Sequence, residues 1–197
     1  MSANSLQDLY ADKLQDLLSA EQQILEALPK MIEKASHAPL RAGFETHLRQ
    51  TQEHARRVER LLQTYGRGAG KKCEGMAGII REGEMTMKEV GDRDALDALL
   101  IAAAQSVEHY EIAGYGTART WARQLGREED ARVLQQTLDE EGETDEQLTQ
   151  IAESMVNPDA VAGEREVAVS GGRDRAAAGG GSTIGRGERD DRPSTGR

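Results

Sequence analysis

Two glutamates lie one helical turn apart in the apolar stretch SVEHYEIAGYG, which spans residues 106–116. Glu108 and Glu111 stand there among valine, isoleucine and tyrosine side chains. A carboxylate on the buried face of a helix needs a partner, because its desolvation is costly when it stays alone. The stretch therefore indicates that these two side chains face other ionisable groups, metal ions or both.

Polar residues interrupt three other helical seams in a similar way. Apolar residues recur every three or four positions along four segments, and each seam becomes polar near its middle. The candidate ligands are Glu21, Gln50, His54, Glu108, Glu111, Glu141 and Asp145. Because a helix rises about 1.5 Å per residue, mid-helix positions of four long helices can meet at one level. Such a set predicts one or two divalent metal ions, iron first, with manganese and zinc as alternatives.

Each candidate also has an ordinary structural interpretation. Glu21 can flank a broader apolar stripe, and His54 can belong to a hydrogen-bonded core network. The run LDEEGETDEQL, which contains Glu141 and Asp145, is typical of a solvated acidic face. His47 lies two turns before His54, and we interpret it as structural. The metal hypothesis depends on four seams that become polar at compatible depths.

Two more side chains carry chemistry of their own. Tyr115, one turn beyond Glu111, is interpreted as a core tyrosine whose hydroxyl bonds a carboxylate, with electron donation as the alternative. Cys73 follows two lysines, which can lower the pKa of a thiol, but we interpret it as a structural thiol.

The apolar periodicity predicts an all-α protein with four long helices. Their approximate ranges are residues 5–35, 39–65, 92–125 and 128–155. Short connections join the first helix to the second and the third to the fourth, so each pair forms an antiparallel hairpin. The intervening segment is long enough to run the length of the bundle, and it contains a short amphipathic pattern at residues 76–87. Two hairpins with one long crossover form a ferritin-like four-helix bundle.

Composition and charge exclude several other classes. The net charge of −10 disfavours nucleic acid as a partner, because phosphates would be repelled. No apolar run approaches about 20 residues, so we expect no membrane partner. The N-terminus lacks the basic and apolar regions of a signal peptide, and the single cysteine forms no disulfide within the chain. We therefore expect a cytoplasmic protein.

The C-terminal part of the chain has a different composition. Residues 157–197 are rich in glycine, arginine and aspartate and contain equal numbers of acidic and basic residues, so the net charge belongs to residues 1–156. Few large apolar side chains are present to offset the entropy of ordering. We predict a helical bundle over residues 1–156 and a disordered tail over residues 157–197.

Five segments resemble the YciE/YciF family of ferritin-like stress proteins. They are LYADKLQDLLSAEQQILEALPKM, FETHLRQTQEHARRVERL, KKCEGMAGIIREG, LIAAAQSVEHYEIAGYGTARTWARQLG and LQQTLDEEGETDEQLTQIA. EHYEIAGYGT and TLDEE are the most specific parts. The resemblance covers about residues 5–155, and it implies a ferritin-like bundle, a homodimer, a di-metal centre and a link to stress conditions.

The resemblance also implies site residues. The glutamates that fit the family's pattern are Glu21, Glu108, Glu111 and Glu141. The second helix departs from the pattern, because this chain reads HLRQT where the family has HLEET, so Arg49 and Gln50 replace two glutamates. Gln50 offers a carbonyl oxygen without a charge, and His54 can compensate. The departure implies one of two outcomes: one full-strength metal site with one weakened site, or a centre too weak to hold metal.

Two functions of different classes are consistent with these residues. The first is a di-metal oxidase of the ferroxidase type, in which carboxylates hold iron or manganese and the oxidant is oxygen or peroxide. The alternative is a non-enzymatic, dimeric helical stress protein with a structural metal or none. Gly114 and Gly116 favour close helix approach, within the bundle or across a dimer. A storage cage is a third, weaker interpretation.

Overall fold

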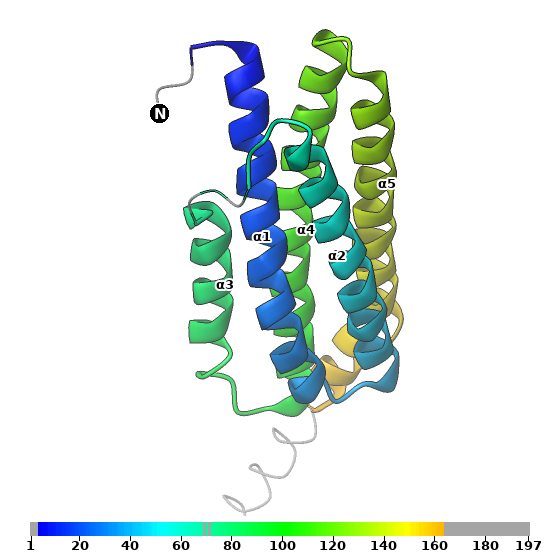
Figure 1. The fold of residues 1–197 in the computed structure, drawn as a ribbon. Coiled ribbons are helices and arrows are strands. Elements are labelled where there is room, and N and C mark those ends of the chain that lie inside the picture. Colours follow the sequence, from blue (N-terminus) through cyan, green and yellow to red (C-terminus); the bar gives the residue numbers. More distant parts are fainter. Residues whose placement is uncertain (1–3, 69, 71, 164–197) are drawn as a thin grey trace, which may run out of the picture. The chain divides into compact units, whose positions relative to one another are not determined.

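The computed structural model describes residues 4–68, 70 and 72–163. These residues form five α-helices and one π-helical segment: α1 (Leu6–Lys34), α2 (Ala38–Gln63), α3 (Glu74–Thr86), α4 (Arg93–Gln124), α5 (Glu128–Ile151) and η1 (Ala152–Val156). The helices α1, α2, α4 and α5 pack as a bundle, and α3 lies against α1 and α4 (Figure 1). The predicted all-α, ferritin-like four-helix bundle is confirmed.

Local sequence signals explain where the long helices begin and end. The side chains of Ser5 and Asp92 each accept a hydrogen bond from a backbone N–H in the first turn of α1 and α4. Gly66 and Gly126 follow α2 and α4 with φ angles of 62° and 71°, a left-handed conformation that glycine adopts without steric cost. These caps lie close to the predicted boundaries.

The crossover between the two hairpins carries α3, as the amphipathic pattern predicts. Cys73 precedes this helix, and its Sγ accepts from the backbone N–H of Met76 and lies 3.0 Å from the Tyr110 hydroxyl oxygen. Burial and a hydrogen bond with Asp16 raise the pKa of the Cys73 thiol above its usual value. The thiol is therefore protonated at neutral pH, which fits the structural interpretation.

Apolar side chains form two clusters rather than one continuous core. One cluster contains Leu28, Phe44 and Leu100, and the other contains Leu14 and Leu62. Along each bundle helix, the residues between the two clusters are the polar ones that interrupt the seam. The bundle is thus held by an apolar cluster on each side of a buried polar layer.

The helix that ends the bundle continues further than expected. η1 follows α5, and residues 157–163 remain helical, past the predicted boundary at residue 156. Val156 is buried in the first apolar cluster, and the Asp159 carboxylate lies 3.1 Å from His37 Nε2. These contacts order a segment whose composition alone disfavours order. Residues 164–197 lie outside the described residues, and their disorder stays a prediction.

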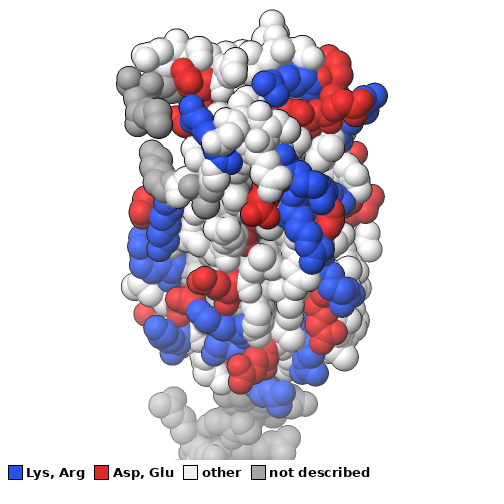
Figure 2. Space-filling model, in the orientation of Figure 1, with Lys and Arg blue, Asp and Glu red and all other residues white. Residues whose placement is uncertain are grey.

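Basic and acidic side chains are intermixed over the face drawn in Figure 2. Neither sign forms a continuous field there. None of the helices in the described part of the chain is long and apolar enough to cross a membrane.

Two helical glycines give a test of the packing between α1 and α4. A Cβ at Gly114 would lie 2.8 Å from Leu17 Cδ2, a buried side chain, whereas a Cβ at Gly116 would meet nothing within 4 Å. Gly116→Ala should stabilise the protein, because alanine favours helix by up to about 1 kcal/mol over glycine. Gly114→Ala should be less stable than Gly116→Ala by about 1–3 kcal/mol, because it overpacks the core. Chemical denaturation of both variants measures this difference, and equal stabilities would contradict the packing at Gly114.

Candidate metal centre

Six ionisable side chains from the four bundle helices meet in the polar layer. They are Glu21 of α1, His47 and His54 of α2, Glu108 and Glu111 of α4, and Glu141 of α5. Each of these residues is at most 3 % exposed to solvent. Their convergence follows from the apolar clusters on either side, which fix the helices so that the polar breaks coincide.

The six side chains form two groups with the geometry of cation sites. The first group is His47, Glu108, Glu111 and Glu141, and the second is Glu21, His54 and Glu141. Within each group, one ligand atom per residue lies within 4.8 Å of the others. Because Glu141 belongs to both groups, they are adjacent halves of one centre that a carboxylate can bridge.

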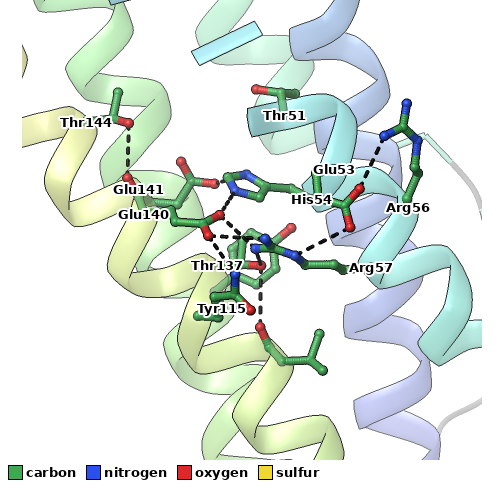
Figure 3. Close-up of polar contacts among 12 residues, drawn as sticks. Thr51, Glu53, His54, Arg56, Arg57, Tyr115, Thr137, Glu140, Glu141 and Thr144 are labelled. Carbon is green, nitrogen blue, oxygen red and sulfur yellow. Dashed lines mark hydrogen bonds and ion pairs between the residues drawn. The ribbon is translucent and has the colours of Figure 1, made fainter. Parts of the chain in front are cut away.

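The His54 ring lies between Glu140 and Glu141, so one of its nitrogens faces the centre and the other faces away from it (Figure 3). Its Nε2 lies 2.6 Å from Glu140 Oε2, and its Nδ1 lies 2.8 Å from Glu141 Oε1. Glu140 orients the ring from outside the centre, so in the neutral imidazole Nε2–H donates to Glu140 and the Nδ1 lone pair faces inward. A carboxylate behind a histidine in this way is the usual support of a metal-binding imidazole.

Arg57 holds Glu140 in its charged state. The two terminal guanidinium nitrogens of Arg57 donate to the two carboxylate oxygens of Glu140, over 2.7 and 3.1 Å. Burial raises the pKa of Glu140, but hydrogen bonds from Arg57, His54 and Gln136 outweigh burial and lower it to about 2. Glu140 is therefore an anion at neutral pH and a fixed anchor for the His54 ring.

His47 lies at the other end of the centre. Its Nε2 is 3.2 Å from Glu108 Oε1, without the alignment of a hydrogen bond, and neither ring nitrogen has a hydrogen-bond partner among the described residues. Burial lowers the pKa of His47. The ring is therefore neutral near pH 7, and it offers a free lone pair to a cation.

The carboxylates of the centre are poorly satisfied by the protein itself. Both oxygens of Glu111, Oε2 of Glu141, and one oxygen each of Glu21 and Glu108 lack a hydrogen-bond partner in the described part of the chain, whereas Glu141 Oε1 faces His54 Nδ1 at 2.8 Å. Burial, reinforced by the neighbouring carboxylates, raises the pKa of Glu108 and of Glu111, and it raises that of Glu21 to about 8. Unpaired buried oxygens at this density are what a bound cation would satisfy.

One half of the centre already contains an ion pair. Burial raises the pKa of Glu141, but His54 outweighs it and lowers the value. Burial lowers the pKa of His54, but Glu141, Glu21 and Glu140 together raise it to about 9. Without a cation, His54 is thus positively charged and Glu141 negatively charged, and the pair links α2 to α5.

Tyr115 is a core tyrosine whose hydroxyl bonds a carboxylate, as we interpreted it from the sequence. It is fully buried, and its hydroxyl donates a hydrogen bond to Glu21 Oε1. Burial, with the charges of Glu21 and Glu111, raises the pKa of the phenol well above its usual value. The hydroxyl thus stays protonated and fixes one carboxylate oxygen of the second group.

Two of the predicted ligands, Gln50 and Asp145, are less buried than the six residues of the centre. Gln50 is only half-buried, unlike the six residues of the centre. Asp145 has a side chain that is 22 % exposed; its Oδ1 accepts from Gln105 over 3.0 Å, and its Oδ2 lies 3.5 Å from exposed His109. Asp145 lies four positions after Glu141, which places it about 40° around the helix from Glu141, while the buried seam of α5 continues through Thr144 and Leu148.

His47 is the residue that the sequence interpretation left out of the site. We interpreted it as structural because it lies two turns from His54, and a single level of ligands was assumed. In the structure both histidines of α2 lie among these groups, His47 in the first and His54 in the second. A signal was present, since His47 begins the HLRQT segment and shares a seam with His54.

Comparison with known proteins agrees with the fold. Residues 5–161 match the family described as a domain of unknown function, DUF892. The chain belongs to this family. Protein YciF of Escherichia coli K12 is 38 % identical over 159 residues, which are 80 % of this chain and 96 % of that protein. The resemblance to the YciE/YciF family is thus confirmed.

Solved structures match as well. The E. coli stress protein YciF superposes with a TM-score of 0.74 at 38 % identity, covering 79 % of this chain and 99 % of that one. YcfI from Rhodopseudomonas palustris gives a TM-score of 0.74 at 39 % identity, covering 77 % and 99 %. A more distant Xanthomonas campestris protein, 23 % identical with a TM-score of 0.65 and coverage of 82 % and 99 %, shares the fold.

The unequal environments of two glutamates predict opposite effects of one substitution. Glu111→Met should stabilise the metal-free protein by about 1–4 kcal/mol, because it removes a buried carboxylate without hydrogen bonds and keeps its volume. Glu140→Met should destabilise it by about 1–3 kcal/mol, because Arg57 and His54 lose their partner. Denaturant unfolding at pH 7 in the presence of a chelator measures both. A destabilised Glu111→Met would show that this carboxylate is satisfied without metal.

Proposed function

We propose that this protein binds divalent metal ions, iron first, in the polar layer of its bundle, and oxidises iron(II) there. The observation that carries the proposal is the pair of ligand groups that share Glu141, with unpaired oxygens on every carboxylate. A ligand set of carboxylate oxygens with one imidazole per group suits iron, manganese or zinc. Manganese and zinc are therefore the alternatives.

The surroundings of the two histidines and four glutamates suit the binding of such ions. The second group has an imidazole oriented from behind by Glu140, and the first has a neutral imidazole with free nitrogens. Glu141 would bridge the groups, Glu108 and Glu111 would complete the first, and Tyr115 would hold one oxygen of Glu21 in place. These roles need no rearrangement of the helices.

An oxidase reaction is the finer part of the proposal. A bound iron or manganese ion would supply the electron transfer to oxygen or peroxide. The surrounding apolar clusters exclude bulk water, and Glu108 and Glu111, whose pKa values are raised, can accept and return protons as the charge of the site changes. Iron(II) added without air and then exposed to oxygen should develop the absorbance of protein-bound iron(III). A flat spectrum with iron bound would exclude the oxidase.

A non-enzymatic role is the second candidate, and one contact favours it. The His54–Glu141 pair, at 2.8 Å, already joins α2 to α5 without a metal ion, and Arg57 extends the link through Glu140. Such a network can stabilise a helical stress protein by itself. The solved relative from E. coli is described as a stress protein, and we extend that role to this chain only as part of the proposal. Association as a homodimer also stays a prediction.

Metal stoichiometry tests the centre directly. Protein purified without a metal-binding tag, loaded with iron(II) and desalted, should carry about two ions per chain, one for each ligand group. Glu141→Gln should reduce binding at both groups, and Glu21→Gln should leave about one ion. Asp145→Asn is the matched control, because Asp145 lies outside both groups, and it should bind as wild type does. Elemental analysis measures the three variants; equal binding by all of them would refute the site.

The pH dependence of binding has a definite sign. In the metal-free protein the pKa of Glu21 is about 8 and that of His54 about 9, so both groups hold protons at neutral pH. A cation needs their deprotonated forms, and binding therefore releases protons. Apparent affinity should rise between about pH 6 and pH 9, by up to about tenfold per pH unit for each proton released. Competition with a chromophoric chelator measures it, and a constant affinity would contradict these protonation states.

A further inference from the structure

A small apolar cavity lies between α1, α3 and α4, beside the metal centre. Its volume is about 50 Å³, and its walls include Ile24 of α1, Ile80 of α3 and Ala104 of α4. The crossover helix α3 covers this side of the bundle, so the cavity exists because α3 packs on α1 and α4 (Figure 1). Nothing in the proposed metal binding itself requires such a space.

The inner end of the cavity is formed by residues of the first ligand group. His47 and Glu108 are the buried polar residues of its lining, 3 % and 1 % exposed. Both nitrogens of His47 and one oxygen of Glu108 lack hydrogen-bond partners among the described residues. The second ligand group does not line the cavity, since neither Glu21 nor His54 belongs to its walls.

The outer end is marked by charged residues at the surface. Lys30 Nζ and Glu84 Oε1 form an ion pair of 2.8 Å between α1 and α3, with side chains 62 % and 41 % exposed, and both residues line the cavity. The lining thus runs from a solvent-exposed pair, past apolar walls, to buried ligand residues. At Gly83 the helices α3 and α4 pack tightly, because a Cβ there would lie 3.3 Å from Ala103 Cβ.

Size and polarity restrict what can occupy the cavity. One water needs about 10–15 Å³ of such space and two to four polar partners, so there is room for a few small molecules, but the apolar walls offer water few bonds. Ligand pockets for larger organic molecules measure about 300–1,000 Å³. Hydrogen peroxide, like water, would lose hydrogen bonds along these walls, whereas dioxygen would lose none.

We propose that this cavity is the route by which dioxygen reaches the His47–Glu108 end of the centre. The inference rests on the proposed function for what happens at that end, and it selects dioxygen over peroxide as the oxidant. It also makes the two ligand groups unequal, because only the first opens onto the cavity. The route itself depends on the walls alone and can be tested without metal.

Dissolved dioxygen is its own probe, because it is paramagnetic and relaxes the nuclear spins that it approaches. In the metal-free protein, the oxygen-induced relaxation of the Ala104 methyl group should be several-fold greater than that of the Ala118 methyl group. Both are buried alanines of α4, and only Ala104 lines the cavity. The ring protons of His47 should show the same enhancement. Equal enhancement at Ala104 and Ala118 would overturn the proposal.

A filled cavity provides the second arm. Ala103→Leu places a larger side chain in the lining and should abolish most of the enhancement at Ala104 and His47, whereas Ala102→Leu, at the adjacent exposed position, should leave it unchanged. Ala27→Leu fills the space from α1 if Ala103→Leu fails to fold. Enhancement that persists in the filled variants would overturn the route.

Iron(II) stoichiometry, measured on the same proteins, separates this inference from the proposed function. Wild type and Ala103→Leu should bind equal amounts, because no ligand is changed. If neither wild type nor Ala103→Leu binds iron while the relaxation pattern is as predicted, the metal centre is refuted and the oxygen route is still supported. Normal iron binding without the relaxation pattern would refute the route alone.

Discussion

Glu141 is the contact on which the rest of the polar layer depends. It pairs with His54 across the bundle, and it lies close enough to His47, Glu108 and Glu111 to complete a second set of ligands. Four buried carboxylates so close together repel one another, and the bundle tolerates them because separate apolar clusters hold the helices on either side. The apolar clusters at the two ends of the helices thus stabilise the fold, and the unpaired carboxylates lie in the layer between them.

The two halves of the centre differ in how firmly their histidines are held. His54 is fixed by the Glu140–Arg57 network, while His47 has no hydrogen bond to either nitrogen in the part of the chain that the structure describes. The His54 half is therefore prepared to keep a cation in one geometry. The His47 half is free to adjust, and it is the half that meets the apolar cavity. Under the proposed function, the His54 group would hold its metal ion in a fixed geometry, and the His47 group would be where the oxidant reacts.

Much of the architecture could be predicted from the sequence because its determinants are local. Seam periodicity, the caps at Ser5 and Asp92 and the glycines after α2 and α4 depend on neighbouring residues, and they locate the helices closely. The buried glutamates could be predicted for the same reason. The helical continuation past residue 156 could not, because it depends on tertiary contacts of Val156 and Asp159. The role of Glu140 beside His54 could not be predicted either. It depends on how α2 and α5 cross, and the sequence does not distinguish Glu140 from the other acidic residues of the LDEEGETDEQL segment.

The charge balance of the site also changes how the glutamine at position 50 is interpreted. The family resemblance implied that a glutamine there weakens one metal site, because a glutamate is missing. Yet the four buried glutamates would supply four negative charges, and two divalent cations would balance them fully, with His47 and His54 as neutral ligands. A further carboxylate at Gln50 would leave an excess negative charge in a layer with little solvent. Under the proposed two-ion centre, glutamine at this position would keep the charges balanced, and the imidazole of His47 would supply the ligand that the sequence interpretation sought in Gln50.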